Sequence, residues 1–279
     1  MFVISCILYT IGTNYVQLLI ARSLHGISSA GMNVAGFSAL ANKYQEDRER
    51  SLIIGLAMSG VASGVIVGYP LGGSLYEFVG KTMPFAILTS IGIVQLFLQF
   101  TDLPEANESL TIGFGTNHSF YDLLKDFRFL VLFGALLLPE VVIAAIEPTL
   151  PRFLEEKMDA EEWEVGAAFL PDSLGFLLGS SLFATLARKI GRKLLTTVSL
   201  LLMSACLIAS SYSRQVAHLI LPQFGVGLGL GGIDASLIPL LALLVDQYCP
   251  GQYGAAYAIG QSAICLGFAL GIFDCFTHE

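Results

Sequence analysis

The chain has 279 residues, of which 54% are hydrophobic and 13% are charged, and its mean hydropathy is +0.72. Soluble globular domains carry about 25% charged and about 45–50% apolar residues, so this composition predicts an integral membrane protein. The net charge of −8 and the pI near 5.0 argue against a nucleic-acid partner, because no basic surface is available to neutralise phosphates.

The cysteines show no spacing that is typical of metal or redox chemistry. Five are present, and none forms a CxxC pair. We therefore expect small packing residues, with no metal site and no cofactor. The sequence also shows no nucleophile with its base, so we do not expect an enzyme.

Apolar runs of about 18 to 27 residues recur along the chain, each long enough for a helix to cross a hydrocarbon core of about 30 Å. Residues 1–13 are apolar but too short to span, and we interpret them as the second half of a helix in a fragment or shortened form. The sequence thus predicts an all-α membrane protein with about eight full transmembrane helices and a partial one. The eight full helices are expected near residues 16–42, 51–76, 83–100, 129–153, 164–187, 194–212, 218–245 and 253–271.

Basic residues gather in alternate loops, which predicts that these loops are cytosolic. The sequons at Asn107 and Asn117 fall in one of them and are expected to stay unglycosylated. The basic residues in question are Lys43, Arg48, Arg50, Lys125, Arg128, Arg188, Lys189, Arg192 and Lys193.

A polar stretch over residues 101–128 divides the apolar runs into two blocks. We expect it to be a cytosolic loop between the remainder of an N-terminal helical bundle (1–100) and an incomplete C-terminal bundle (129–271), followed by a tail (272–279). Two bundles with a binding site between them are a common transporter layout.

Glycines recur every fourth residue at Gly60, Gly64, Gly68 and Gly72, on one face of a predicted helix. Small residues let helix backbones approach closely in lipid, so this stripe predicts either helix packing or a hinge. Pro70 predicts a kink or break near its end. A second glycine-rich segment, residues 225–232, supports the same interpretation less specifically.

Five ionisable residues fall within predicted spans: Arg22, Glu140, Glu147, Asp172 and Asp234. A charge at the centre of a span costs about 2.5–3.5 kcal/mol on insertion scales, so such residues usually mark a pathway or an ion pair.

Prolines at 148 and 151 follow Glu147 and could bend its helix, so that the carboxylate lines a cavity. Glu140 lies seven residues earlier, about 10 Å along the same helix face. Glu140 belongs either to the same aqueous path or to a structural pair.

Asp234 lies among small residues, where a buried carboxylate can exchange a proton or hold a cation. Asp172 follows Pro171, and we interpret it as the cap of a broken helix end in preference to a residue of the pathway. Phe169 and Phe176 could offer aromatic faces to an ammonium group, although helix packing is the simpler explanation for both. Arg22 could reach the surface or pair with an internal acid.

Several segments resemble the vesicular amine transporters, the monoamine and acetylcholine carriers of the major facilitator superfamily. ARKIGRK (187–193) resembles the superfamily's loop signature, and GVASGVIVGYPLGG (60–73) resembles its antiporter signature. LLIARSLHGISSAG, LYEFVGKTMPF, IEPTLP, WEVGAAFLP, PQFGVGLGLGGIDASLIP, LLVD and YGAAYAIG carry the narrower resemblance, which runs to about Gly271.

The resemblance implies a twelve-helix fold, of which this chain would hold part, truncated at both ends. It implies that Glu147 helps to bind amine, that Asp234 is essential, and that Arg22 is the family's fourth-helix arginine. Arg192, with Lys189, would help to close the cytosolic side, and Phe169 would line the binding chamber.

The chain also departs from the family pattern. The eleventh-helix aspartate is Gln261 here, an asparagine of the seventh helix is Glu140, and an alanine of the eighth is Asp172. A tyrosine of the eighth helix is Phe176, and the antiporter signature carries Tyr69 in place of proline. Glu140 or Asp172 could take over the proton traffic that Gln261 cannot carry.

These observations predict a proton-coupled antiporter that loads a cationic amine, with a monoamine favoured, into acidic secretory or synaptic vesicles. Its partners would be the amine, protons and the lipid bilayer. Two alternatives stay open: a non-transporting truncated isoform, and a related proton-coupled exporter of drugs or polyamines.

Overall fold

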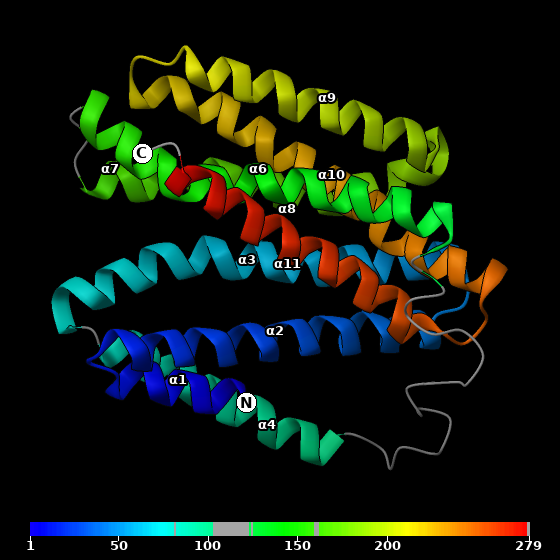
Figure 1. The fold of residues 1–279 in the computed structure, drawn as a ribbon, viewed down its shortest axis with the longest axis horizontal. Coiled ribbons are helices and arrows are strands. Elements are labelled where there is room, and N and C mark those ends of the chain that lie inside the picture. The colour runs from blue at the N-terminus through cyan, green and yellow to red at the C-terminus, as the bar shows by residue number, and fades with distance from the viewer. Residues whose placement is uncertain (81, 103–122, 124, 159–161, 278–279) are drawn as a thin grey trace. The chain divides into compact units, whose positions relative to one another are not determined.

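The computed structural model describes residues 1–80, 82–102, 123, 125–158 and 162–277, and the secondary structure in these ranges is helical (Figure 1). The helices are α1 (Phe2–Ile11), α2 (Tyr15–Lys43), α3 (Asp47–Val79), α4 (Thr82–Asp102), α6 (Phe127–Met158), α7 (Glu162–Ala167), α8 (Leu170–Ile190), α9 (Arg192–Ser211), α10 (Val216–Tyr248) and α11 (Tyr253–Thr277). The sequons at 107 and 117 and most of the predicted inter-bundle loop lie outside the described residues.

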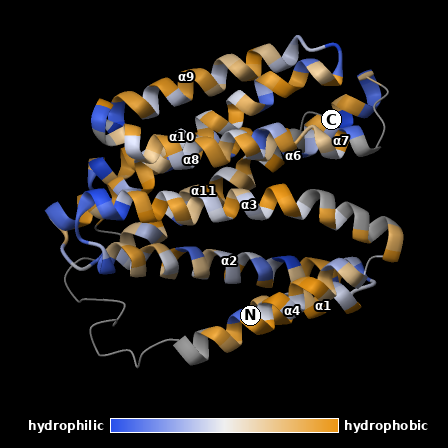
Figure 2. Cartoon of the chain, turned by 180° about the vertical axis from the view of Figure 1, so that it is seen from behind, coloured by the Kyte–Doolittle hydropathy of each residue, from blue (hydrophilic) through white to orange (hydrophobic). Residues whose placement is uncertain are grey.

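Helices form over all eight predicted ranges, which confirms the all-α membrane fold. Six of the described helical segments, in α3, α6, α7 with α8, α9, α10 and α11, are long and apolar enough to cross a membrane. The apolar described part of α4, Thr82–Leu98, is shorter, and α2 carries polar residues such as Arg22 and His25. In Figure 2, hydrophobic residues run along α6, α9 and α10, and hydrophilic residues gather near the ends of α9.

The helices divide into two compact units. Unit 1 comprises residues 1–36 and 67–112, and unit 2 comprises residues 37–66 and 113–279. In unit 1, α1 packs against α4. The His25 ring lies 5.4 Å from that of Phe2 and 6.3 Å from that of Tyr9, and Tyr9 stacks on Phe85.

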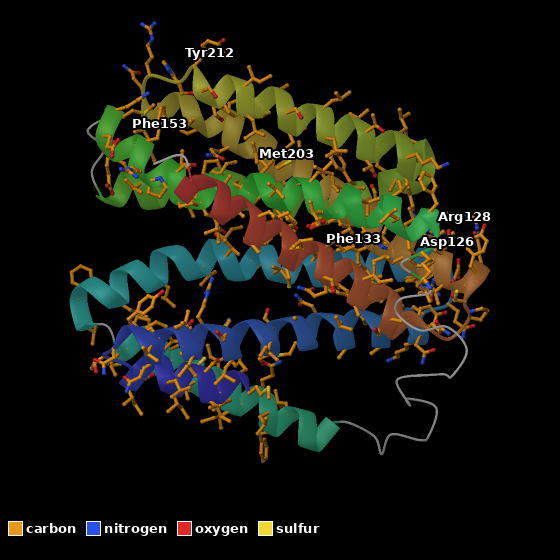
Figure 3. The ribbon with its side chains drawn as sticks, in the orientation of Figure 1. Asp126, Arg128, Phe133, Phe153, Met203 and Tyr212 are labelled. Carbon is orange, nitrogen blue, oxygen red and sulfur yellow. The ribbon has the colours of Figure 1, made fainter. Side chains whose placement is uncertain are left out.

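In unit 2, α10 lies between α8 and α9 and presents glycines to both. A Cβ placed at Gly231 would come within 2.7 Å of the Phe176 carbonyl oxygen of α8. A Cβ placed at Gly229 would come within 3.1 Å of the Cβ of Met203 on α9, which is labelled in Figure 3. The second glycine-rich segment therefore allows two helices to pack closely on α10.

The α6 and α11 pair uses small residues in the same way. A Cβ placed at Gly267 would come within 2.8 Å of the Leu137 carbonyl oxygen, and one at Gly271 within 2.7 Å of the Ala144 Cβ. These glycines are four residues apart, so both lie on the face of α11 that meets α6.

The glycine stripe of α3 is different. No described atom lies within 4 Å of a Cβ placed at Gly60, Gly64, Gly68 or Gly72. The close approach of α3 to α8 is at Gly55, which precedes the stripe. A Cβ placed at Gly55 would come within 2.9 Å of the Ala184 Cβ of α8. The backbone of α3 stays helical through Pro70, so the predicted break does not occur.

One predicted span, 164–187, is interrupted in the structure. Ala168 and Phe169 form a turn between α7 and α8, and Pro171 lies in the first turn of α8. Proline cannot donate a backbone hydrogen bond and is favoured in the first turn of a helix, where that donor has no intrahelical acceptor, and α8 begins there. By contrast, α6 is one continuous helix of 32 residues that contains Pro139, Pro148 and Pro151.

Candidate transport site

The acids within the predicted spans of unit 2 come from three helices. On α6, Glu140 is 6% exposed, and its Cβ faces Gly267 of α11. Glu147 lies seven residues later with an exposed side chain, about 10 Å along the helix axis. Glu147 and Glu140 are close enough to interact electrostatically.

Asp234 lies near the middle of α10 and is 4% exposed. Its neighbours in sequence, Gly232, Ile233, Ala235 and Ser236, are also buried. Its Oδ1 atom is buried and has no hydrogen-bond partner among the described residues. A buried carboxylate in that state is costly when ionised, so it needs a proton or a cation.

Asp172 lies in the first turn of α8, but it does not cap the helix, so that prediction was wrong. Phe169 is the N-cap residue, and no side chain makes a capping hydrogen bond. The Asp172 backbone carbonyl and side chain pack instead against Gly227 of α10. Its Oδ1 atom is also buried without a hydrogen-bond partner among the described residues.

Electrostatic interactions link the four carboxylates in series. Glu140 interacts with Asp234 and with Glu147, and Glu147 also interacts with Asp172. Within the described part of the chain, no group of three or more His, Cys, Asp or Glu side chains is arranged to hold a metal ion.

The two predicted chamber aromatics are half-buried. Phe169 packs against an apolar cluster formed by Leu150, Leu154, Ala168 and Leu219. The backbone of Phe176 lies against Gly231. The contacts of Phe169 fit a packing role, and a role in binding amine stays a prediction for both residues.

The predicted cytosolic-gate residues lie where α8 meets α9. Gly191 joins the two helices with a φ of +102°, a conformation that glycine adopts without strain. Arg192 then pairs with Asp47 in the first turn of α3, at 2.5 Å, and donates to the Ser51 hydroxyl at 3.1 Å. Lys189 is exposed.

A second ionic cluster, which sequence reasoning did not single out, joins α3 to α10 and α11. Arg50 is 1% exposed and pairs with Asp246 at 2.6 Å. It also donates to the Tyr44 carbonyl at 2.7 Å, and the Tyr253 hydroxyl donates to Asp246. Arg50 and Asp246 are far apart in sequence, so no local pattern predicts that they pair. The one available signal is the position of Asp246, an acid at the end of a long apolar run.

Near this cluster, Asp126 accepts a hydrogen bond from the Arg128 backbone N–H at 3.0 Å at the start of α6 (Figure 3). The Arg128 guanidinium lies 4.0 Å from the Tyr248 ring centroid at the end of α10. Burial raises the pKa of the Cys249 thiol in the following loop, and the Asp126 charge raises it further.

Arg22 and Gln261 are two further positions that the sequence singles out. Arg22 is exposed on the unit 1 part of α2. Gln261, where the resemblance expects an aspartate, is half-buried on α11 and donates to the Cys265 sulfur at 3.6 Å. The role of Arg22 stays a prediction.

Residues 1–272 match the profile described as Major Facilitator Superfamily. The human synaptic vesicular amine transporter is 39% identical over 274 residues, covering 96% of this chain and 52% of the relative. The rat chromaffin granule amine transporter is 38% identical over 268 residues, and the probable vesicular acetylcholine transporter-A of Danio rerio is 33% identical over 273 residues. The chain spans about half the length of these curated relatives.

A solved structure shares the fold. The human organic anion transporter TETRAN superposes with a TM-score of 0.79 at 17% identity, covering 98% of this chain and 68% of that protein. At that identity the likeness concerns the fold alone.

Proposed function

The chain belongs to the major facilitator superfamily, and we propose that it is a proton-coupled antiporter that moves a cationic amine, with a monoamine favoured, into an acidic vesicle. The observation that carries the proposal is the buried state of the Asp234 carboxylate. This carboxylate is buried in mid-span, has an oxygen without a hydrogen-bond partner among the described residues, and interacts electrostatically with Glu140. The printed names of the relatives, which are amine and acetylcholine transporters, support the choice of substrate class.

The coupling logic is electrostatic. A proton and an ammonium ion compete for the same carboxylates, and two neighbouring carboxylates repel one another when both are ionised. On the cytosolic side, Asp234 and Glu147 would release a proton and take the amine. In the acidic lumen, protonation would displace the amine. A ligand shifts a conformational equilibrium only by its differential affinity, so the proton and the amine would favour different states.

The ionic contacts at the helix ends would close the cytosolic side. Arg192 with Asp47 and Arg50 with Asp246 join the start of α3 to the α8–α9 junction and to the end of α10. A path to the cytosol could open only if these two ion pairs separate. We therefore expect the pairs to be formed in the conformation that is closed to the cytosol and broken in the one that is open to it.

The experiment is uptake of labelled monoamine and of acetylcholine into acidified vesicles that carry the chain, with an ionophore control. The proposal predicts gradient-dependent uptake that falls at least about tenfold, or 1.4 kcal/mol, in Asp234→Asn and Glu147→Gln. Glu155→Gln changes an exposed acid at the end of α6 and is the matched control. Equal uptake by the control and the Asp234→Asn variant would remove Asp234 from the mechanism.

A further inference from the structure

The junction between α8 and α9 concentrates positive charge in a part of the sequence that has no acids. No acidic residue lies between Asp172 and Asp234. By contrast, residues 43–50, at the junction between α2 and α3, hold three basic and three acidic residues. The basic residues at the α8–α9 junction are Arg188, Lys189, Arg192 and Lys193.

One of these cations is balanced by an acid from another helix. Arg192 pairs with Asp47 of α3. Lys189 and Lys193 are exposed, and neither has an ion-pair partner among the described residues. Lys193 also lies in the first turn of α9, which contains no acid and where the helix dipole disfavours a cation. Two positive charges at the junction are therefore open to an external anion.

Exposed apolar side chains continue from the two lysines along both helices. On α9, Leu194, Val198 and Leu201 are exposed and lie on one helix face. On α8, Leu182 is exposed and lies two turns before Lys189 on the same face. In Figure 2, the hydrophilic end of α9 that adjoins α8 passes directly into a run of hydrophobic residues. The junction thus combines cations at the helix ends with apolar surface along the helices.

An anionic phospholipid has the same division between a charged and an apolar part. A soluble anion could meet the lysines, but it would leave the apolar faces of α8 and α9 uncovered. The loop is predicted to be cytosolic, and the cytosolic leaflet is the one that carries anionic lipids and attracts juxtamembrane basic residues.

We propose that the α8–α9 junction is a binding site for an anionic phospholipid. Its phosphate lies at Lys189 and Lys193, and its acyl chains lie along the exposed apolar faces of α8 and α9. The site uses neither the carboxylates within the spans nor the proposed amine, so it stands or falls independently of the proposed transport.

The test is native mass spectrometry of the purified full chain, released from detergent micelles after titration with one lipid at a time. Dioleoyl phosphatidylserine and dioleoyl phosphatidylcholine have the same acyl chains and differ in net charge. O-phospho-L-serine, added in excess as a competitor, supplies the charged headgroup without the chains.

We expect phosphatidylserine to bind at least about fivefold more tightly than phosphatidylcholine. The double variant Lys189→Gln/Lys193→Gln should lose this preference while its affinity for phosphatidylcholine stays unchanged, which shows that the variant is folded. The matched control is Lys43→Gln/Arg48→Gln, which removes two exposed cations from the α2–α3 junction and should keep the preference. Excess O-phospho-L-serine should not displace the lipid.

Three results would overturn the proposal, each for a different reason. Equal affinities for the two lipids would show that the junction does not select an anionic headgroup. An equal loss of preference in the Lys43→Gln/Arg48→Gln control would show that the net charge of the chain, and not this junction, attracts the lipid. Displacement by O-phospho-L-serine would show that the junction binds a soluble anion and that the apolar faces contribute nothing.

Discussion

Arg50 forms a buried ion pair that a hydropathy profile does not predict. Its side chain is almost fully buried between Asp246 and the backbone carbonyl of Tyr44, yet in sequence it is one basic residue in a polar loop. The intramembrane acids could be predicted because an ionisable residue in a long apolar run is conspicuous without any partner being known. Long-range pairs such as Arg50 with Asp246 could not, because the fold alone brings the partners together.

The first prediction concerns the stability of this ion pair. Arg50→Ala leaves Asp246 without its cation and two backbone carbonyls without a donor, so it should lower the free energy of unfolding by about 1–3 kcal/mol. Arg152→Ala removes an exposed pair with Glu156, and its cost should be about 0.5 kcal/mol or less. Unfolding of both variants in mixed detergent micelles measures the difference, and equal costs would show that the Arg50 contacts are not stabilising.

The second prediction concerns the reactivity of the Cys249 thiol. Because the Asp126 charge contributes to the raised pKa of that thiol, Asp126→Asn should lower the pKa and increase the thiolate fraction at neutral pH. We expect alkylation of Cys249 to accelerate about twofold, as quantified by peptide mass spectrometry. Arg214→Gln, a change at an exposed residue in a different loop, is the control, and an equal acceleration in that variant would exclude a local effect.

At the scale of the helix, the sequence predicts the positions of the helices better than it predicts which residues make the contacts between them. Long apolar runs determined the positions of all eight expected helices. The close contacts came mainly from residues 225–232 and from Gly267 and Gly271, while the more regular stripe from Gly60 to Gly72 meets no described atom. A glycine pattern shows that an approach is possible, but the partner helix is chosen by the rest of the fold.

The third prediction is that replacing two different glycines by alanine changes the stability of the protein in opposite directions. Gly231→Ala introduces a Cβ against backbone atoms of α8 at 2.7–2.8 Å, so α8 and α10 must separate, at a cost of about 1–3 kcal/mol. Gly60→Ala adds a methyl group where the structure describes no neighbour within 4 Å, and it should stabilise α3 by up to about 1 kcal/mol. Thermal unfolding of both variants tests the contrast, and destabilisation by Gly60→Ala would show that the stripe packs against a partner.

The interruption between α7 and α8 has a similar lesson. Pro171 marks a helix start, but Asp172, which the sequence predicts to be the cap, has a buried oxygen that makes no hydrogen bond to a described residue. Sequence alone cannot distinguish an aspartate that caps a helix from one that faces a neighbouring helix, since both follow the same proline.

At the scale of the whole molecule, the distribution of basic residues makes a prediction about topology. The loop that holds Asn107 and Asn117 should be cytosolic, so neither asparagine should carry a glycan when the chain is expressed in a secretory membrane. A sequon inserted beside Arg214, in a loop expected to be lumenal, is the positive control. A glycan on Asn107 or Asn117 would reverse the proposed direction of transport.

In the proposed mechanism, protons and an amine compete for the carboxylates within the spans of unit 2. The most direct measurement is uptake of a labelled amine by proteoliposomes of the purified chain under pH gradients of both directions and of none. We predict accumulation against the amine gradient when the interior is acidic, efflux when the gradient is reversed, and only equilibration without a gradient. Uptake that is indifferent to the gradient, or no uptake by a correctly inserted chain, would contradict this mechanism.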